Sequence, residues 1–165
     1  MKRVTFDDMD CSIARTLDVV GEWWTPLIVR EVFFGRRRFD EIQSDLGIAR
    51  NVLTARLNRL VDEGILYRHD IGERGQRYEY RLTEQGAELF PVLVALMNWG
   101  DKWRRNPKGA PTELVHESCG ERTTPTLCCS ECGEELTSRD VRAQPGRRWK
   151  KDDTHPLVRA ARTAR

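Results

Sequence analysis

Hydrophobic residues recur every three or four positions through most of residues 11–103, which is the pattern of amphipathic helices packed on one core. The first helical stretch ends at Gly21, a residue suited to closing a helix. The second is expected to begin with Thr25 as its N-cap and Pro26 at its first position, and to end at Gly35. The pattern therefore predicts two helices joined by a short turn.

A second pair of helices is predicted immediately afterwards. A short helix ends at Gly47, and a turn of two or three residues leads into a longer helix. The apolar side of the longer helix consists of Leu53, Leu57 and Leu60. Its opposite side is polar, but it lacks the usual coat of Glu and Lys, so this side is a candidate recognition surface.

Two strands and a final helix follow. Residues 65–70 and 77–83 show strand character on either side of a polar tip. Thr83 is placed to cap the helix that runs to the tryptophans near residue 103, and Pro91 should kink this helix or mark a short first segment. We expect the folded core to end near residues 105–111, where proline and glycine appear and large aliphatic residues become fewer.

Composition limits the class of protein without naming it. The chain has 165 residues, 39% hydrophobic and 33% charged, which suits one globular domain with an appendage. No apolar run approaches the roughly 20 residues that cross a bilayer, and the start lacks a secretory pattern, so a cytoplasmic protein without membrane contact is expected. A net charge of +2 does not itself indicate a polyanionic partner, but arginines cluster locally.

The order of helix, tight turn, helix and two-stranded ribbon predicts an α+β, mainly α, winged helix-turn-helix. In this fold one helix enters the major groove of double-stranded DNA and the ribbon follows the backbone. Arginine pairs with guanine edges, asparagine with adenine, and threonine with a base edge or a thymine methyl group. Arginines and backbone amides at the start of the short helix should favour a phosphate. The candidate DNA-contacting residues are Arg37, Arg38, Arg50, Asn51, Thr54, Asn58, Arg74, Gln76 and Arg77.

Several ordered landmarks make residues 11–105 resemble the HxlR-type winged-helix transcriptional regulators, which are related to the MarR group. The landmarks are Cys11, Trp24, Arg38 with Phe39, Gly64 with Ile65, Glu79 to Thr83 with Gly86, and Trp99 with Gly100. The resemblance implies flanking dimerisation helices, a homodimer built from the first and last helices, and a nearly palindromic site with half-sites about 10 bp apart. Such a regulator is expected to be a repressor rather than an activator, and its domain should span residues 11–106.

Two segments depart from the family pattern. The family often opens the recognition helix with serine and proline, where this chain has Ala49 and Arg50. The wing tip also lacks the proline that is common there. Both departures affect DNA-contacting segments, so they bear on the operator sequence rather than on the fold.

A second group of residues lies beyond the winged helix, in an extension at 112–141. His116 with Cys119 and Cys129 with Cys132 form two pairs of equal spacing, each followed by glycine. This spacing predicts a zinc-ribbon-like extension with one structural zinc ion and no open position for a catalytic water. Cys128 could substitute as a ligand, and the alternative is a set of free or redox-active thiols. Residues 142–165 form a basic tail that we expect to be flexible.

Cys11 is a candidate redox sensor. Some HxlR-type proteins resemble thiol sensors with a cysteine before the first helix, where backbone dipoles favour a thiolate that reacts with oxidants or other small-molecule signals. Nearby aspartates oppose this effect, and a small, partly buried structural residue is the alternative.

Two other function classes are weaker. A winged helix can serve as a protein-interaction module, here with a zinc-stabilised docking extension. The outer face of the recognition helix carries Arg50, Asn51, Arg56 and Arg59 rather than acidic residues, which favours DNA. An enzyme is not expected, because the three histidines are scattered and no nucleophile motif is present.

Overall fold

The computed structural model describes residue 6 and residues 9–72 and 77–147. Contacts within the chain divide it into two units, Met1–Pro111 and Thr112–Arg165. The first unit contains all the described helices, and the second contains short hairpins. Each unit is described by itself.

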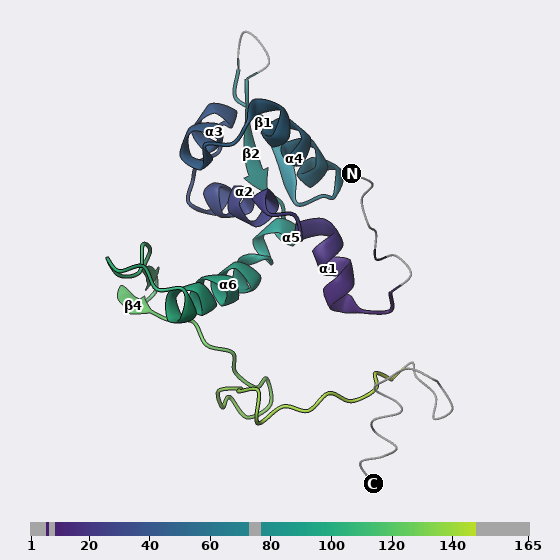
Figure 1. Ribbon diagram of the computed structural model, residues 1–165, viewed down its shortest axis with the longest axis vertical. Coiled ribbons are helices and arrows are strands. Elements are labelled where there is room, and N and C mark those ends of the chain that lie inside the picture. Colours follow the sequence, from purple (N-terminus) through teal and green to yellow (C-terminus); the bar gives the residue numbers. More distant parts are fainter. Residues whose placement is uncertain (1–5, 7–8, 73–76, 148–165) are drawn as a thin grey trace. The chain divides into compact units, whose positions relative to one another are not determined.

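The first unit is mainly helical with one small antiparallel sheet (Figure 1), as the sequence predicted. Its α3 and α4 are separated by three residues and are followed directly by the hairpin, in the order of a winged helix-turn-helix. The elements are α1 (Ser12–Val20), α2 (Trp24–Phe33), α3 (Phe39–Leu46), α4 (Arg50–Asp62), β1 (Leu66–Asp70), β2 (Tyr78–Leu82), α5 (Glu84–Ala87) and α6 (Phe90–Trp103).

One hydrophobic core joins α2, α3, α4 and the hairpin. The three leucines predicted for the apolar side of α4 are at most 1% exposed. Each such side chain contributes roughly 1.5–3 kcal/mol relative to an exposed one. The buried members of the cluster are Ile28, Val29, Val32, Ile42, Ile48, Leu53, Leu57, Leu60, Ile65, Leu66 and Tyr80.

The turn between α3 and α4 depends on one glycine. Gly47 ends α3 with φ of +60°, a left-handed conformation that residues with a Cβ rarely adopt. The next residue, Ile48, is buried in the core, and its carbonyl oxygen accepts a hydrogen bond of 3.3 Å from Gln43 Nε2. The glycine thus reverses the chain while Ile48 fixes the start of α4 against α3.

The hairpin is hydrogen-bonded to the segment that precedes α3. Its strands pair from Leu66 opposite Leu82 to Asp70 opposite Tyr78, in agreement with the predicted strands. The backbone N–H of Tyr80 donates to the carbonyl oxygen of Arg37 at 2.8 Å, which joins β2 to the segment before α3. The wing is therefore positioned by the same core that holds α4.

Thr83 and Pro91 act as the sequence predicted. The Thr83 hydroxyl accepts a hydrogen bond of 3.0 Å from the backbone N–H of Gly86 and caps the four-residue α5. A new helix, α6, then begins at Phe90, with Pro91 in its first turn where a missing N–H costs little. Pro91 therefore separates a short first segment from the long helix.

The predicted start of the second helix is wrong in detail. Thr25 is not the N-cap, since α2 begins at Trp24 and no side chain caps it. Thr25 is instead buried in the first turn, where its backbone N–H donates to the carbonyl oxygen of Glu22 at 2.9 Å. Thr25 is buried and Trp24 packs against the core, and this packing outweighs the local preference of a threonine for the capping position.

The second unit consists of short hairpins. Strands β3 (Leu114–His116) and β4 (Glu121–Thr123) form one, and a bridge between Cys128 and Glu135 closes another. No side chain between residues 112 and 147 is buried, so the described part of this unit has no hydrophobic core. No regular helix or strand occurs in 142–147, and the rest of the predicted basic tail lies outside the described residues.

Gly86 provides a test of the packing between α5 and the hairpin. A Cβ at this position would collide with the carbonyl oxygen of Ile65 and lie 3.1 Å from Leu82 Cδ2. We expect Gly86→Ala to lower the free energy of unfolding by about 1–3 kcal/mol, because the backbone must shift. Urea denaturation measures this. Glu88→Ala, at an exposed position beside the same helix, should stay within about 0.5 kcal/mol, and equal stability of the two variants would contradict the expected collision.

Candidate nucleic-acid interface

The outer side of α4 is exposed along its length. The four residues predicted to read DNA on this helix, Arg50, Asn51, Thr54 and Asn58, are all exposed, while the leucines behind them are buried. They occupy neighbouring positions on one face because residues three or four apart in a helix align. The structure thus brings these four predicted residues together.

Arg50 is oriented by contacts with α3. Its guanidinium carbon lies 4.8 Å from the centroid of the Phe39 ring, and its Nη1 lies 4.0 Å from Asp40 Oδ1. The side chain of Arg50 nevertheless remains 74% exposed. Stacking and a loose surface ion pair of this kind hold a side chain weakly, so the guanidinium remains available to a base or phosphate.

Asn58 and Thr54 already make contacts within the unit. The Asn58 carbonyl oxygen accepts a hydrogen bond from Arg68 Nη2 of β1, and the Arg68 guanidinium carbon lies 5.3 Å from the Tyr78 ring centroid. The Thr54 hydroxyl donates to the carbonyl oxygen of Arg50 at 2.8 Å and can still accept. Asn58 therefore also links α4 to the wing, a role that the sequence did not indicate.

The three arginines before α3 divide into two kinds. Arg36 is structural, because it pairs with Asp45 and, at 3.3 Å, with the carboxylate of Glu31, which is 2% exposed. Arg37 and Arg38 are exposed, and neither guanidinium has an ion pair within the part of the chain that the structure describes. The guanidinium groups of Arg37 and Arg38 are therefore available to bind a phosphate.

The backbone amides at this point are already engaged. The N–H groups of Arg37 and Arg38 donate to Glu41 Oε2 at 3.1 and 3.0 Å. The carboxylate of Glu41 therefore occupies the place at the start of α3 where the sequence predicted amides to help bind a phosphate. A phosphate contact here would come from the two guanidinium groups.

Arg56 and Arg59 do not belong to the outer face, so their assignment to it is wrong. Both are partly buried, and both form ion pairs with Glu22 in the turn between α1 and α2. Arg59 also donates to the backbone carbonyl of Asp18 and lies 3.4 Å from Glu63. These arginines fasten α4 to α1 rather than adding charge to the recognition surface.

On the wing, Arg77 is exposed just before β2, and its carbonyl oxygen accepts from the N–H of Ile71 at 2.9 Å. The other two predicted wing residues, Arg74 and Gln76, lie outside the described residues. Arg68, exposed on β1 beside α4, is a candidate that the sequence analysis missed. Strand alternation alone could not show that it reaches Asn58.

The predicted metal ligands lie in two separate pairs. His116 Nδ1 is 3.4 Å from Cys119 Sγ. Backbone N–H groups of Cys132 and Glu131, followed by the Cys132 side chain, lower the pKa of the Cys129 thiol below its usual value. All five cysteines are free, and no three His, Cys, Asp or Glu side chains in the described ranges form a group that could hold a metal. The zinc site stays a prediction.

Cys11 lies directly before α1 with an extended backbone and a half-buried side chain. Its carbonyl oxygen accepts from the backbone N–H of Arg15 at 3.1 Å, so the residue begins the helix as predicted. Asp10, the residue before it, lies 3.8 Å from the Arg15 guanidinium.

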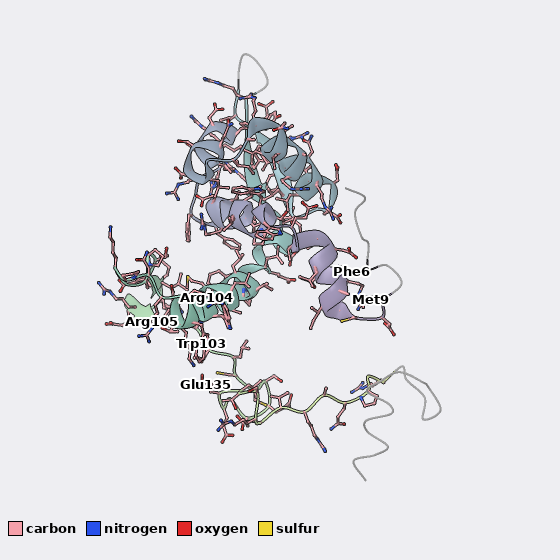
Figure 2. All side chains as sticks on the ribbon, viewed as in Figure 1. Phe6, Met9, Trp103, Arg104, Arg105 and Glu135 are labelled. Atoms are coloured by element: carbon pink, nitrogen blue, oxygen red, sulfur yellow. The ribbon has the colours of Figure 1, made fainter. Side chains whose placement is uncertain are left out.

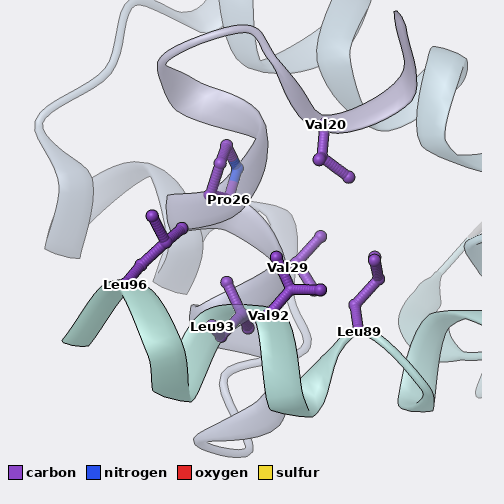
Figure 3. Close-up of a pocket in the computed structure, with 7 residues that line it drawn as sticks. All are labelled: Val20, Pro26, Val29, Leu89, Val92, Leu93 and Leu96. Atoms are coloured by element: carbon purple, nitrogen blue, oxygen red, sulfur yellow. The ribbon is translucent and has the colours of Figure 1, made fainter. Parts of the chain in front are cut away.

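A small apolar groove lies between α1, α2 and the start of α6 (Figure 3). Its lining is entirely aliphatic apart from a proline, so it offers no group for acid–base chemistry. The lining residues are Val20, Pro26, Val29, Leu89, Val92, Leu93 and Leu96.

The geometry of α3, α4 and the hairpin defines a winged helix-turn-helix protein. Residues 19–108 match the model of the HxlR-like helix-turn-helix family. The chain therefore belongs to this family and is a helix-turn-helix transcriptional regulator, which confirms the resemblance seen in its motifs. The family and the relatives described next are regulators, so the chain is not an enzyme.

The chain is 48% identical over 135 residues to Rv3095 of Mycobacterium tuberculosis, an uncharacterised HTH-type transcriptional regulator, covering 82% of this chain and 85% of the relative. An alignment of 135 residues cannot end before residue 135 of this chain. It therefore includes the His116–Cys119 pair and the Cys129–Cys132 pair. Among the described residues no helix has the length and apolar character needed to cross a membrane.

Two solved structures are also similar. The crystal structure of PA1607, a candidate transcription factor, has a TM-score of 0.76 and 37% identity, and it covers 87% of this chain and all of its own. The redox regulator HypR in its reduced form has a TM-score of 0.54 and 30% identity, covering 57% of this chain and 94% of its own.

Proposed function

We propose that this chain is a dimeric, sequence-specific DNA-binding regulator that represses transcription in the cytoplasm, with α4 as the helix that enters the major groove. The observation that carries the proposal is the exposed side of α4, which presents Arg50, Asn51 and Thr54 while its leucines are buried. Guanidinium, amide and hydroxyl groups are those that bind base edges. A regulator bound in this way excludes other proteins from its site, which is the simplest route to repression.

Binding to the DNA backbone falls to the arginines around α4. Arg37 and Arg38 stand before α3, and Arg77 stands just before β2 at the tip end of the hairpin, all exposed. Phosphate contacts position a protein on DNA without selecting a sequence, whereas contacts to base edges select it. The two roles can therefore be separated by mutation.

We expect Asn51→Ala and Arg38→Ala to have different effects on DNA binding by the full chain. Asn51→Ala should reduce discrimination between a site selected from random DNA and a single-base variant by about 1–3 kcal/mol, because a base contact is lost. Arg38→Ala should weaken binding to all sequences alike and lower the slope of log affinity against log salt by about 0.9, because one phosphate contact is lost. Fluorescence anisotropy titrations measure both quantities.

Arg15→Ala is the matched control, because it removes an exposed arginine from α1, outside the proposed DNA face. It should leave both the discrimination and the salt slope unchanged. Wild-type binding that does not depend on DNA sequence would overturn the proposal. If Asn51→Ala lowered the salt slope and Arg38→Ala reduced discrimination between sites, the assignment of their roles would be overturned.

The proposed dimer uses exposed apolar faces of α1 and α6. Leu96, Trp99 and Trp103 are between 56% and 62% exposed and occur at helical spacing on one side of α6. Trp103 stands at the C-terminal end of that helix (Figure 2). On α1, Ile13 is 71% and Leu17 47% exposed, one turn apart. Large contiguous apolar surfaces of this kind usually mark protein contacts.

We expect Leu96→Glu to convert the dimer to a monomer and to abolish high-affinity binding to a palindromic site, since a charge would be buried in the interface. Sedimentation equilibrium measures the mass of the species. Lys108→Glu adds the same side chain at an exposed position beyond the end of α6 and should remain dimeric. A wild-type monomer bound to DNA, or a dimeric Leu96→Glu, would count against this interface.

A response to thiol oxidants is the finer part of the proposal. Cys11 begins α1, one of the helices in the proposed dimer interface, and HypR, a redox regulator by its description, shares the fold at 30% identity. Modification of a thiol at this place would add bulk or a cross-link next to α1 and so alter how the two recognition helices are spaced.

Treatment with diamide should change the DNA affinity of the wild-type chain at least tenfold, which corresponds to about 1.4 kcal/mol, and should leave Cys11→Ser unaffected. The reason is that Cys11→Ser lacks the thiol beside the dimerisation helix. Cys128→Ser, which keeps Cys11, should respond like the wild type. If Cys11→Ser responded fully, the sensor would have to be one of the other cysteines.

A further inference from the structure

The second unit contains two hairpin turns of the same design. In the first, His116 pairs with Glu121 across a turn of four residues that includes Cys119. In the second, the backbone N–H of Cys129 donates to the carbonyl oxygen of Glu134 at 2.8 Å across a turn of four residues that includes Cys132. The histidine and the first cysteine of the two turns therefore occupy equivalent positions.

The backbone of the two turns is also equivalent. Gly120 donates from its N–H to the carbonyl oxygen of His116 at 2.8 Å, and Gly133 donates to that of Cys129 at 2.9 Å. The glycines have φ values of +73° and +76°, a left-handed conformation that closes each turn. Sequence spacing alone could not show that the turns share a hydrogen-bond pattern and a backbone conformation.

This unit needs a source of stability other than a core. Its apolar side chains Val115, Leu127 and Val141 are between 53% and 67% exposed, and nothing between 112 and 147 is buried. Folded segments shorter than about 40 residues usually depend on disulfides, metals or association. All four cysteines of this unit are free thiols, so disulfides do not supply the stability.

We propose that the two turns are the halves of one structural zinc site, with His116, Cys119, Cys129 and Cys132 as the four ligands. One imidazole nitrogen and three thiolates form a set that Zn²⁺ binds tetrahedrally, with the protons of the thiols released on binding. His116 Nδ1 lies 3.4 Å from Cys119 Sγ in the first turn, and the Cys129 and Cys132 side chains interact in the second. The ion would hold the two hairpins together. The site is closed, so its role is to fold the extension and not to catalyse a reaction.

Cys128 is excluded from the ligand set by its register. It pairs with Glu135 in extended backbone one residue before Cys129, and neighbouring side chains of a strand point to opposite faces. Its thiol contacts the Thr126 hydroxyl at 3.8 Å instead. Cys128 is therefore the natural control for a cysteine substitution that should not affect the metal.

The test is the zinc content of the full chain after dialysis, together with titration of the apoprotein with Co²⁺ as a spectroscopic probe. The wild type and Cys128→Ser should each retain about one zinc per chain in a tetrahedral site. Cys119→Ser and Cys132→Ser, one from each turn, should weaken binding by at least about 100-fold, more than the loss of an outer-shell partner. His116→Cys should retain the metal, and its Co²⁺ complex should show a fourth thiolate in the charge-transfer absorption.

A wild-type chain that neither retains zinc nor binds Co²⁺ tetrahedrally would overturn the proposal. Loss of metal in Cys128→Ser, or a metal affinity equal to that of the wild type in either Cys119→Ser or Cys132→Ser, would also overturn it, because the ligand set would then be different. The His116→Cys variant separates loss of a ligand from failure to fold, since only a ligand role allows a thiolate to replace the imidazole. Metal content does not depend on DNA binding, so the outcome is distinct from that of the proposed function.

Discussion

The burial of one side of α4 is the constraint on which the winged helix depends. Leu53, Leu57 and Leu60 fit against α2, α3 and the hairpin with almost no exposed area, so α4 cannot rotate without exposing them. Gly47 and Ile48 fix the other degree of freedom, the point at which the helix leaves α3. Packing of the apolar side of α4 therefore turns its polar side toward solvent. The polar side chains need no further contacts within the protein to stay exposed.

Arginines in this protein have two physical roles that depend on their partners. Arg36, Arg56 and Arg59 are bound to carboxylates of Glu31 or Glu22. Arg56 and Arg59 thereby connect α4 to the turn between α1 and α2, whereas Arg36 links the turn after α2 to that helix. Arg37 and Arg38 are exposed beside them without such partners among the described residues. A count of basic residues cannot separate the two groups, because the separation depends on which carboxylate the fold brings within about 4 Å.

The elements were predictable from the sequence because their signals are local. Leucine spacing, the glycine at position 47 and the proline at position 91 each act within one or two turns of chain, and each was confirmed. The misplaced start of α2 and the assignment of Arg56 and Arg59 to the outer face share one cause. Both depend on contacts across the core or across the turn at Glu22, which no local pattern contains.

The two units also differ in what could be known from sequence. In the first unit, periodic apolar residues reveal both the elements and the core that unites them, since a buried helix face must have a surface to pack on. In the second unit the apolar residues remain exposed, and the regular feature is the pair of glycine-closed turns at 120 and 133. The spacing of the candidate ligands predicts each turn separately. Because no hydrophobic core joins the two turns, their association depends on the chemistry of their side chains. The described geometry, with histidine and cysteine at equivalent positions, therefore carries information that hydrophobic patterning could not supply.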